Sequence, residues 1–368
     1  MKLLEAILIL SGMIIGVGMF GIPYAFSRAG FWLGTAELII LTGVVLTAHI
    51  LYGEIVLRTP AYHRLPGYVR IYLGKRAALV SWISAIAGII GTLLAYIILG
   101  AFFLHTIWGG IAESFFAFLM VLFGALITYF PLRREAAING ALTALLVLFI
   151  IAISIFLLPE INKENILGFN LNEIFLPYGI IFFALAGGVV VPDLTAFLGR
   201  KRESVRLAII IGTILPAVLY FIFALVMVGT LGLMVSEDAI TSLLSLAGEP
   251  IVKFGALIGL LAAFTSYITL HMSFQALLRL DLKINKFTAW FTALSVPLFL
   301  YFIGFRNFIM VISIIGALGV GIDTALILAS YHNLRSKTNS ASSSLYIGEI
   351  ILYFLITIGI ISTLWYTQ

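Results

Sequence analysis

The sequence predicts an all-α protein that crosses a membrane many times. Hydrophobic residues make up 62% of the 368 residues and charged residues only 10%, and the mean hydropathy is +1.18. Soluble domains carry about 25% charged residues, so a surface this poor in charge has to face lipid. The apolar residues form long runs, each able to cross a hydrocarbon core that needs about 20 residues of helix. A transmembrane β-barrel would show short alternating segments instead, and the sequence lacks that pattern.

Eleven apolar runs predict eleven helical spans, since a helix satisfies its own backbone hydrogen bonds inside lipid. Pro60, Pro131, Pro159 and the turn at Gly30 mark several of the ends. The first run is too long for a signal-peptide core and lacks a small-residue cleavage site, so we expect it to stay as a membrane helix. The predicted spans are 4–27, 31–57, 78–106, 114–131, 136–158, 174–199, 206–232, 251–278, 287–304, 308–332 and 345–366.

The basic residues predict the orientation of these spans. With a cytoplasmic N-terminus, all but four of the 21 Lys and Arg residues fall in cytoplasmic segments, as short loops require. An odd number of spans then places the C-terminus outside. Because the net charge of +5 comes from these loops, we expect no nucleic-acid partner, and we expect the protein to lie in the cell membrane (plasma or inner). The four outer cations are Arg28, Lys163, Lys253 and Arg306.

The composition also argues against an enzyme. The chain has no cysteine, which excludes disulfides, thiolate metal sites and cysteine nucleophiles. Its five histidines are scattered and no acidic cluster lies within a span, so no metal-dependent active site or cofactor is indicated. The longest connections, near 58–77 and 232–250, are too short for a soluble domain. We therefore expect one transmembrane domain over 1–368.

Two of the predicted spans contain matched interruptions. The first span reads SGMIIGVGMFGIP from Ser11 to Pro23, and the sixth reads FALAGGVVVPD from Phe183 to Asp193. Glycine destabilises a helix by about 1 kcal/mol relative to alanine, and proline by about 3 kcal/mol. In both spans the glycine at the break, Gly18 or Gly187, precedes a proline by five positions. The composition therefore favours local unwinding at mid-depth in both helices.

The matched interruptions predict an inverted-repeat transporter. The first span enters from the cytoplasm and the sixth from outside, so the two breaks lie in halves of opposite orientation. Free amides near Gly16 to Gly18 suit a carboxylate, and the carbonyl end of a half-helix suits an ammonium group. That combination suits a zwitterion. The alternative is that these glycines only allow close helix packing; the equal offset in two distant spans favours the breaks.

Four stretches, together with the sixth-span break, resemble the amino acid–polyamine–organocation (APC) superfamily of transporters. The closest branches are the amino acid/auxin permeases and the bacterial aromatic amino acid permeases. The stretches that carry the resemblance are Ile15 to Phe26, Tyr52 to Arg58, Arg64 to Tyr68 and Ala263 to Tyr267.

The resemblance implies the APC/LeuT-type fold. In that fold two five-helix repeats of inverted orientation, here 4–158 and 174–332, enclose the transport site. The last predicted helix, 345–366, would then be an accessory helix.

The resemblance also implies a substrate site. The family pattern places the substrate carboxylate on the backbone amides of the first break and an aromatic gate at Phe183. Tyr96 matches a position where a tyrosine reaches the substrate; the plainer interpretation is a core aromatic whose hydroxyl bonds elsewhere. The implied substrate-binding residues are Gly16, Val17, Gly18, Tyr96, Phe183, Ala184, Ala186 and Gly187.

Sodium-coupled members of the superfamily suggest a cation site between the first and eighth spans. Hydroxyls and carbonyls are the oxygen ligands that hard cations require, although Ser and Thr in helices often bond their own backbone instead. The fifth span contains no lysine, so the lysine-based proton coupling of some relatives is not indicated. The positions that match the cation site are Gly12, Ile15, Ala262, Thr265 and Ser266.

Two acidic residues are further candidates for a proton or gate function, because an ionisable group in a membrane is costly. Asp323 lies inside the tenth span and is a candidate proton carrier or gate, or a fixed partner of a basic residue or an amide. Asp193 follows the sixth-span break, where it either faces the transport pathway or pairs with the basic stretch Arg200 to Arg202.

Neither break carries an obvious counter-charge for a charged side chain. We therefore expect the substrate to be a neutral amino acid, with aromatic and hydrophobic ones among the candidates. The predicted function is secondary active transport by alternating access, coupled to Na⁺ or H⁺. The alternatives are an intramembrane enzyme, a channel and a sensor. The preferred amino acid, the coupling ion, the direction of transport and the oligomeric state stay open.

Overall fold

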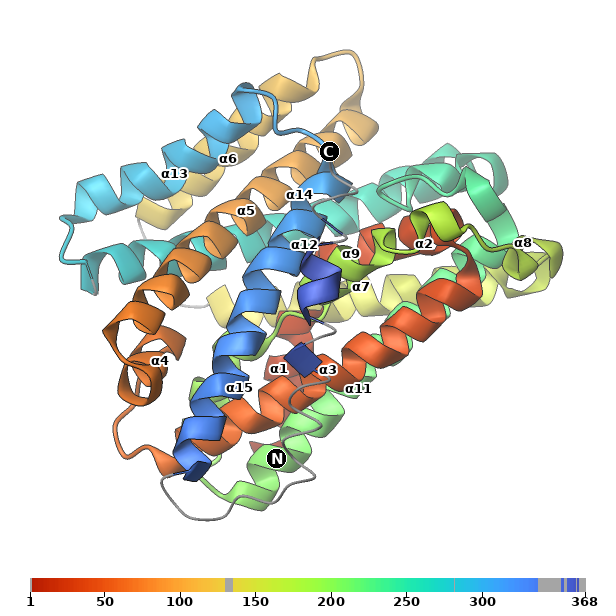
Figure 1. Ribbon diagram of the computed structural model, residues 1–368. Coiled ribbons are helices and arrows are strands. Elements are labelled where there is room, and N and C mark those ends of the chain that lie inside the picture. The colour runs from red at the N-terminus through yellow and green to blue at the C-terminus, as the bar shows by residue number, and fades with distance from the viewer. Residues whose placement is uncertain are drawn as a thin grey trace.

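The computed structural model describes residues 2–129, 135–280 and 282–336, with the short pieces 352–353, 356–361 and 363. Throughout these residues the chain is helical, with no strand (Figure 1). The α-helices are α1 (Lys2–Ile14), α2 (Gly18–Ala29), α3 (Phe31–Arg58), α4 (Leu65–Leu73), α5 (Lys75–Trp108), α6 (Glu113–Tyr129), α7 (Glu135–Leu157), α8 (Glu164–Leu167), α9 (Leu176–Ala184), α10 (Val191–Phe197), α11 (Arg202–Leu231), α12 (Leu244–Leu280), α13 (Lys286–Phe302), α14 (Phe308–Ile314) and α15 (Gly321–Ser336). Short 3₁₀ turns are η1 (Leu158–Glu160), η2 (Leu171–Glu173), η3 (Gly188–Val190), η4 (Gly232–Met234) and η5 (Thr241–Leu243), and η6 (Ile315–Val320) is a π-helix.

Helices occupy each of the first ten predicted spans. Within the described residues, seven helical segments are long and apolar enough to cross a membrane, and the bent pair α1 and α2 would be an eighth. Two further apolar helices, α6 and α13, are shorter. The eleven spans and their orientation therefore stay predictions. Most of the last predicted span, 345–366, lies outside the described residues, as do Arg133, Arg134 and Lys337, which contribute to the predicted orientation.

Three features of the helices differ from the prediction. The connection near 58–77 contains the helix α4, which has a proline in its first turn, a position where the missing N–H costs nothing. Helix α12 begins at Leu244, earlier than the predicted residue 251, because a kink at Gly248 (φ 78°) joins two helical pieces. The tenth span is interrupted by the π-helix η6. Hydropathy detects apolar length, and none of these features changes it.

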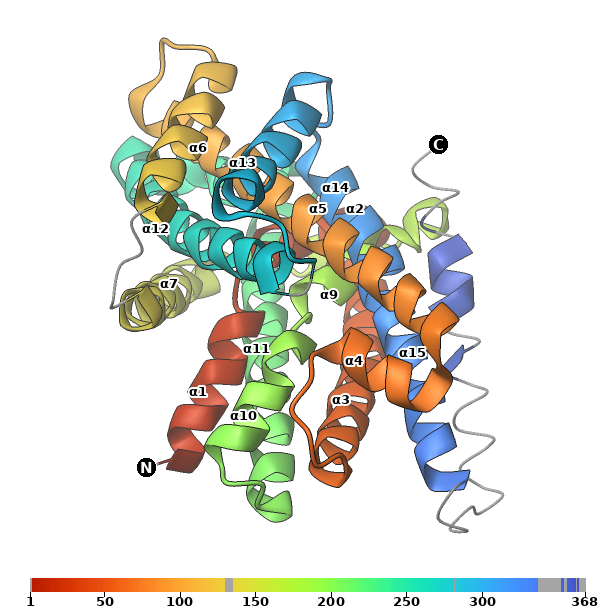
Figure 2. The same cartoon turned by 90° about the vertical axis from the view of Figure 1, so that its left-hand side faces the viewer.

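The helices pack in two groups that meet along α9, η6 and α5. In the first group α1 lies against α10 and α11, and α3 packs against α11 (Figure 2). In the second group α5 packs against α12, α6 and α13. Helix α14 and the π-helix η6 bridge the groups by touching both α9 and α5, and α15 then packs against α3, α4 and α5. The broken segments α1–α2 and α9–α10 both belong to the first group.

Helix α9 and the π-helix η6 approach each other backbone to backbone. A Cβ atom added to Gly316 would collide with the carbonyl of Gly179 and lie 2.7 Å from the amide nitrogen of Phe183. A Cβ on Gly179 would in turn collide with the backbone of Ser313. Small residues permit such close approach between membrane helices. The contact holds η6 directly beside the last turn of α9, where the second break begins.

Candidate functional site

The first helix is interrupted where the sequence predicts it. Helix α1 ends at Ile14, α2 begins at Gly18, and the two axes are bent by 58°. No described residue accepts a hydrogen bond from the N–H groups of Gly16, Val17 or Gly18. These three donors lie at the start of α2, where the helix dipole is positive. The first break therefore presents an arrangement suited to an anion.

The sixth predicted span is interrupted as well. Helix α9 ends at Ala184, the backbone is non-helical through Gly187, and η3 and α10 follow. Among the described residues, none accepts a hydrogen bond from the N–H groups of Gly187, Gly188 or Val189. The second break thus has its own set of three unpaired amides. The sequence predicts a carboxylate site at the first break only, so this second set of amides was not predicted.

The prolines do not occupy equivalent positions, although their offsets from glycine are equal. Pro192 is the second residue of α10, close to the break. Pro23 lies inside α2, which has already restarted at Gly18. In the first helix, the short stretch Ile15 to Val17 is therefore unwound and Pro23 is not part of the break.

The two breaks are in direct contact. A Cβ atom added to Gly18 would lie 2.8 Å from both the Cα of Ala184 and Cδ1 of Phe183. A Cβ added to Gly187 would lie 2.6 Å from Cγ1 of Ile14. Each break thus packs on the end of the half-helix that leads into the other break, and glycine is required at both contacts.

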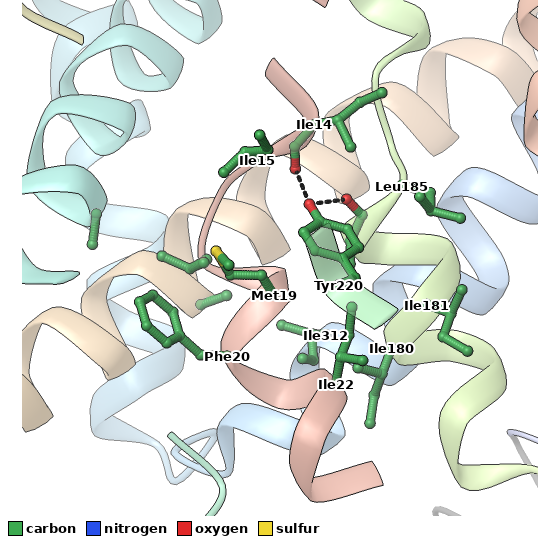
Figure 3. Packing of buried hydrophobic residues seen from close by; sticks show 14 of the residues in the cluster. Ile14, Ile15, Met19, Phe20, Ile22, Ile180, Ile181, Leu185, Tyr220 and Ile312 are labelled. Carbon is green, nitrogen blue, oxygen red and sulfur yellow. Dashed lines mark hydrogen bonds between the residues drawn. The ribbon is translucent and has the colours of Figure 1, made fainter. Parts of the chain in front are cut away.

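One buried tyrosine joins the carbonyl ends of both half-helices. The hydroxyl of Tyr220, on α11, is 2.7 Å from the carbonyl oxygen of Ile14 and 3.1 Å from that of Ala184 (Figure 3). The side chain has no solvent exposure. Carbonyls at helix C-termini lack intrahelical donors, and a tyrosine has one O–H proton to donate, so the two carbonyls share it. Sequence reasoning missed Tyr220, because one hydroxyl in an apolar span does not reveal which carbonyls it faces.

Tyr96 connects the first break to α12. Its side chain is 8% exposed and shares a hydrogen bond with the side chain of Ser266. A Cβ added to Gly16 would lie 3.7 Å from the Tyr96 hydroxyl oxygen. The structure therefore brings together Gly16 from the predicted substrate site, Ser266 from the predicted cation site, and Tyr96 between them.

The remaining predicted substrate residues follow the second break. Phe183 is partly buried and contacts Gly18, while Ala184 is 2% exposed. The N–H of Ala186 donates to the carbonyl of Phe183 over 3.1 Å. This turn closes α9, and the next three amides, those of Gly187, Gly188 and Val189, donate to no described residue.

The predicted cation residues are only partly assembled. The Thr265 hydroxyl is 3.0 Å from the carbonyl of Leu261 and 3.2 Å from that of Ala262, which is the bonding to its own helix that the plainer interpretation describes. Ile15 is buried at the first break. A Cβ on Gly12 would lie 4.0 Å from Thr143 of α7, so this position faces a residue that the sequence analysis did not include.

Asp323 lies in the first turn of α15, directly after the π-helix η6. Asp323 shares a hydrogen bond with the Ser84 side chain on α5. Its Oδ1 atom is buried and has no partner among the described residues. Intramembrane carboxylates usually pair with a cation or line a pathway, and π-helical turns recur at functional sites.

Asp193 is exposed and bonded to a tyrosine. The Tyr62 hydroxyl donates to Asp193 Oδ1 over 2.5 Å. Burial, followed by this hydrogen bond, raises the pKa of the Tyr62 phenol to about 12. Tyr62 therefore stays a donor at physiological pH. The partner is thus a tyrosine from the connection before α4 and not the basic stretch that follows α10.

That basic stretch binds the end of α3 instead. Arg200 donates through Nη2 to the carbonyls of Val56, Leu57 and Thr59 at 2.7–3.0 Å, which satisfies the last carbonyls of the helix. Arg202 pairs with Glu54 over 2.6 Å. Glu54 also pairs with Arg58, one turn later on α3, at 3.5 Å. The region between α10 and α11 is thereby tied to α3.

No group of three or more His, Asp or Glu side chains suited to a metal ion occurs in the part of the chain that the structure describes. His271 and Gln275, one turn apart on α12, share a hydrogen bond over 3.0 Å.

Comparison with known proteins places this site in a family. The model of the tryptophan/tyrosine permease family matches residues 1–366. The chain is 24% identical to a protein named glutamine transporter 2 of Aliivibrio fischeri (strain ATCC 700601 / ES114), over 98% of each chain. It is similar in fold to MhsT crystallised with L-phenylalanine (TM-score 0.61, 16% identity, 99% of this chain and 98% of that one). It is also similar in fold to the inward-facing conformation of Mhp1 (TM-score 0.65, 11% identity, 87% and 75%).

These likenesses confirm the LeuT-type fold and agree with the APC resemblance at the broad level, without selecting the predicted branches. They also establish a multi-pass membrane transporter of the cell membrane and exclude the enzyme alternative. With its full-length match to one family model, the chain belongs to the tryptophan/tyrosine permease family.

Proposed function

We propose that this protein is a secondary active transporter that moves a neutral amino acid by alternating access, coupled to Na⁺ or H⁺. The observation that carries the proposal is the contact between two unwound helix segments at the carbonyl ends of two half-helices, each with three amides that donate to no described residue. The names of the family, the Aliivibrio relative and the MhsT complex all refer to neutral amino acids, which supports this substrate class.

The proposed substrate pose uses backbone groups for the parts common to all amino acids. The carboxylate binds the amides of Gly16, Val17 and Gly18, where the dipole of α2 favours negative charge. The ammonium group binds carbonyl oxygen at the end of a half-helix. The side chain then lies near Phe183 and Tyr96. The remaining substrate-binding residues are Ala184, Ala186 and Gly187.

A neutral side chain fits the charges near the breaks. A charged substrate side chain would need a buried counter-charge. Asp193 is the acidic residue closest to the second break along the chain, and it is exposed and held by Tyr62.

Uptake into proteoliposomes tests the proposal. Purified protein is reconstituted and offered a panel of labelled amino acids, with and without Na⁺ and pH gradients. We expect uptake of one or a few neutral amino acids that rises with one of the two gradients. Uptake that is flat across the panel would contradict the proposal, and single-channel currents far above carrier turnover would favour a channel.

Two substitutions separate the coupling ions. If Na⁺ binds among Gly12, Ile15, Ala262, Thr265 and Ser266, Thr265→Ala removes an oxygen ligand and should lower the Na⁺ dependence of uptake about tenfold or more. A matched control is Thr47→Ala, because the Thr47 hydroxyl also donates to its own helix, over 2.7 Å to Gly43. Unchanged Na⁺ dependence in Thr265→Ala would remove this residue from the site.

If Asp323 carries the coupling proton, Asp323→Asn should abolish the response of uptake to a pH gradient while leaving gradient-independent exchange, because the amide cannot take up and release a proton. Glu249→Gln is the control, since that carboxylate is exposed and paired with Lys253 over 2.7 Å. A pH response that survives in Asp323→Asn would rule out Asp323 as the carrier.

A further inference from the structure

A buried histidine, which the proposed transport site does not use, lies against the second break. His49 is within α3 and is 4% exposed. Its Nδ1 atom is 3.2 Å from the hydroxyl of Thr213 on α11, which has no exposure. The opposite edge of the ring faces η3, since a Cβ added to Gly188 would lie 3.6 Å from both Cδ2 and Nε2 of His49.

The preceding residue on α11, Gly212, contacts the end of α1. The Ser11 hydroxyl donates to the carbonyl of Gly212 over 3.2 Å. A Cβ on Gly212 would lie 3.0 Å from the Cβ of Leu10. The imidazole therefore lies where α3, α11 and η3 meet, close to the end of α1. This is the part of the site that lies toward α1 and α10.

Among the described residues, no ion pair or hydrogen bond joins His49 to a charged side chain. The Thr213 hydroxyl and Gly188 lie next to the ring. On α3 the nearby titratable residues are Tyr52, whose ring packs on Tyr68, and Glu54, which pairs with Arg58 and Arg202. On α10, Asp193 accepts a hydrogen bond from Tyr62. On α15, which also packs against α3, Asp323 shares a hydrogen bond with Ser84 and interacts electrostatically with Tyr52.

Among the described residues, no carboxylate contacts His49. An unpaired buried cation is strongly disfavoured. The arrangement in which η3 packs on His49 therefore accommodates the neutral imidazole; we call it the closed arrangement. Because Nδ1 is hydrogen-bonded to Thr213, the Nε2 edge of the ring is the one that water would reach if η3 moved away.

We propose that His49 is a proton-binding site that is loaded when η3 moves away from α3, so that acid favours the conformation in which the α1 and α10 side of the site is open. The inference rests on the alternating access of the proposed function. It does not depend on which ion drives transport. Imidazole is suited to this part because its ordinary pKa of about 6.5 lies within the physiological range once it is hydrated.

The effect has a definite size. If a group binds a proton only in the open state, the ratio of open to closed molecules rises as the pH falls below the pKa of that group. For an imidazole with its ordinary pKa of about 6.5 that is protonated only in the open state, lowering the pH from 8 to 6 raises the ratio of open to closed molecules about fourfold.

Cysteine labelling tests this without knowledge of the substrate. The natural chain has no cysteine, so Ser11→Cys creates a single thiol at a position that is 3% exposed. The rate of modification by a water-soluble maleimide is measured between pH 8 and pH 6 in Ser11→Cys and in Ser11→Cys/His49→Gln. The ratio of the two rates cancels the pH dependence of the thiolate.

We expect this ratio to rise about fourfold on acidification. The variant Ser11→Cys/His105→Gln is the control and should follow Ser11→Cys, because His105 bonds the carbonyl of Ile111 away from both breaks. A ratio that does not change with pH overturns the proposal.

A second comparison keeps the histidine in place, should His49→Gln fail to fold. Ser336→Cys, at the exposed end of α15, reports the thiol chemistry alone. The rate of Ser11→Cys relative to Ser336→Cys should begin to rise near pH 6.5 and keep rising toward pH 6, and a flat ratio contradicts the proposal. Because labelling needs no transport, a failure of uptake with an intact labelling response would count against the proposed function only.

Discussion

Gly18→Ala is expected to reduce uptake strongly, because the new methyl group would lie 2.8 Å from the Cα of Ala184 and from the ring of Phe183. A backbone atom cannot yield as the tip of a flexible side chain does, so the two breaks have to separate. Overpacking of this kind costs about 1–3 kcal/mol, which corresponds to about 5–150-fold in the population of the assembled site. Initial uptake rates at equal amounts of reconstituted protein measure the loss.

Gly43→Ala provides the matched control. This glycine is exposed within α3, and a Cβ there meets no atom within 4 Å. The substitution should leave uptake unchanged and stabilise the helix by up to about 1 kcal/mol. Full uptake by Gly18→Ala would show that the close contact between the breaks is not needed for transport.

Tyr220→Phe is expected to have a comparable effect for a different reason. The ring remains, but the carbonyls of Ile14 and Ala184 lose the hydroxyl that they share. Leaving a buried acceptor unsatisfied costs about 1–3 kcal/mol, so uptake should fall about 5–150-fold, together with a lower melting temperature.

Tyr178→Phe is the comparison for this loss, because the Tyr178 hydroxyl also donates to a carbonyl, that of Ile356 at 3.3 Å, away from the breaks. Its effect on uptake should be several-fold smaller. Equal losses in the two variants would mean that Tyr220 stabilises the fold generally and does not act through the half-helix ends.

The local features of this fold were predictable from sequence. Long apolar runs predict the helices, and the glycines near Gly16 and Gly187 predict the interruptions, because helix length and backbone propensity depend on neighbouring residues. Propensity identifies a weak point without showing where the helix restarts, and Pro23 lies inside the restarted helix α2.

The contacts across the site were not predictable in this way. Tyr220 is separated by 206 positions from Ile14, and His49 by 164 from Thr213. Such pairs arise only when the helices are packed, and hydropathy carries no information about which residues then face one another. The π-helix η6 is likewise a product of packing, since its close contact with Gly179 accompanies it.

A structure determined with the transported amino acid bound tests the central claim most directly. We predict that the ligand lies between the two breaks, with its carboxylate oxygens about 3 Å from the amide nitrogens of Gly16, Val17 and Gly18. An amino acid bound elsewhere in the protein, with both sets of unpaired amides away from its carboxylate, would contradict the account.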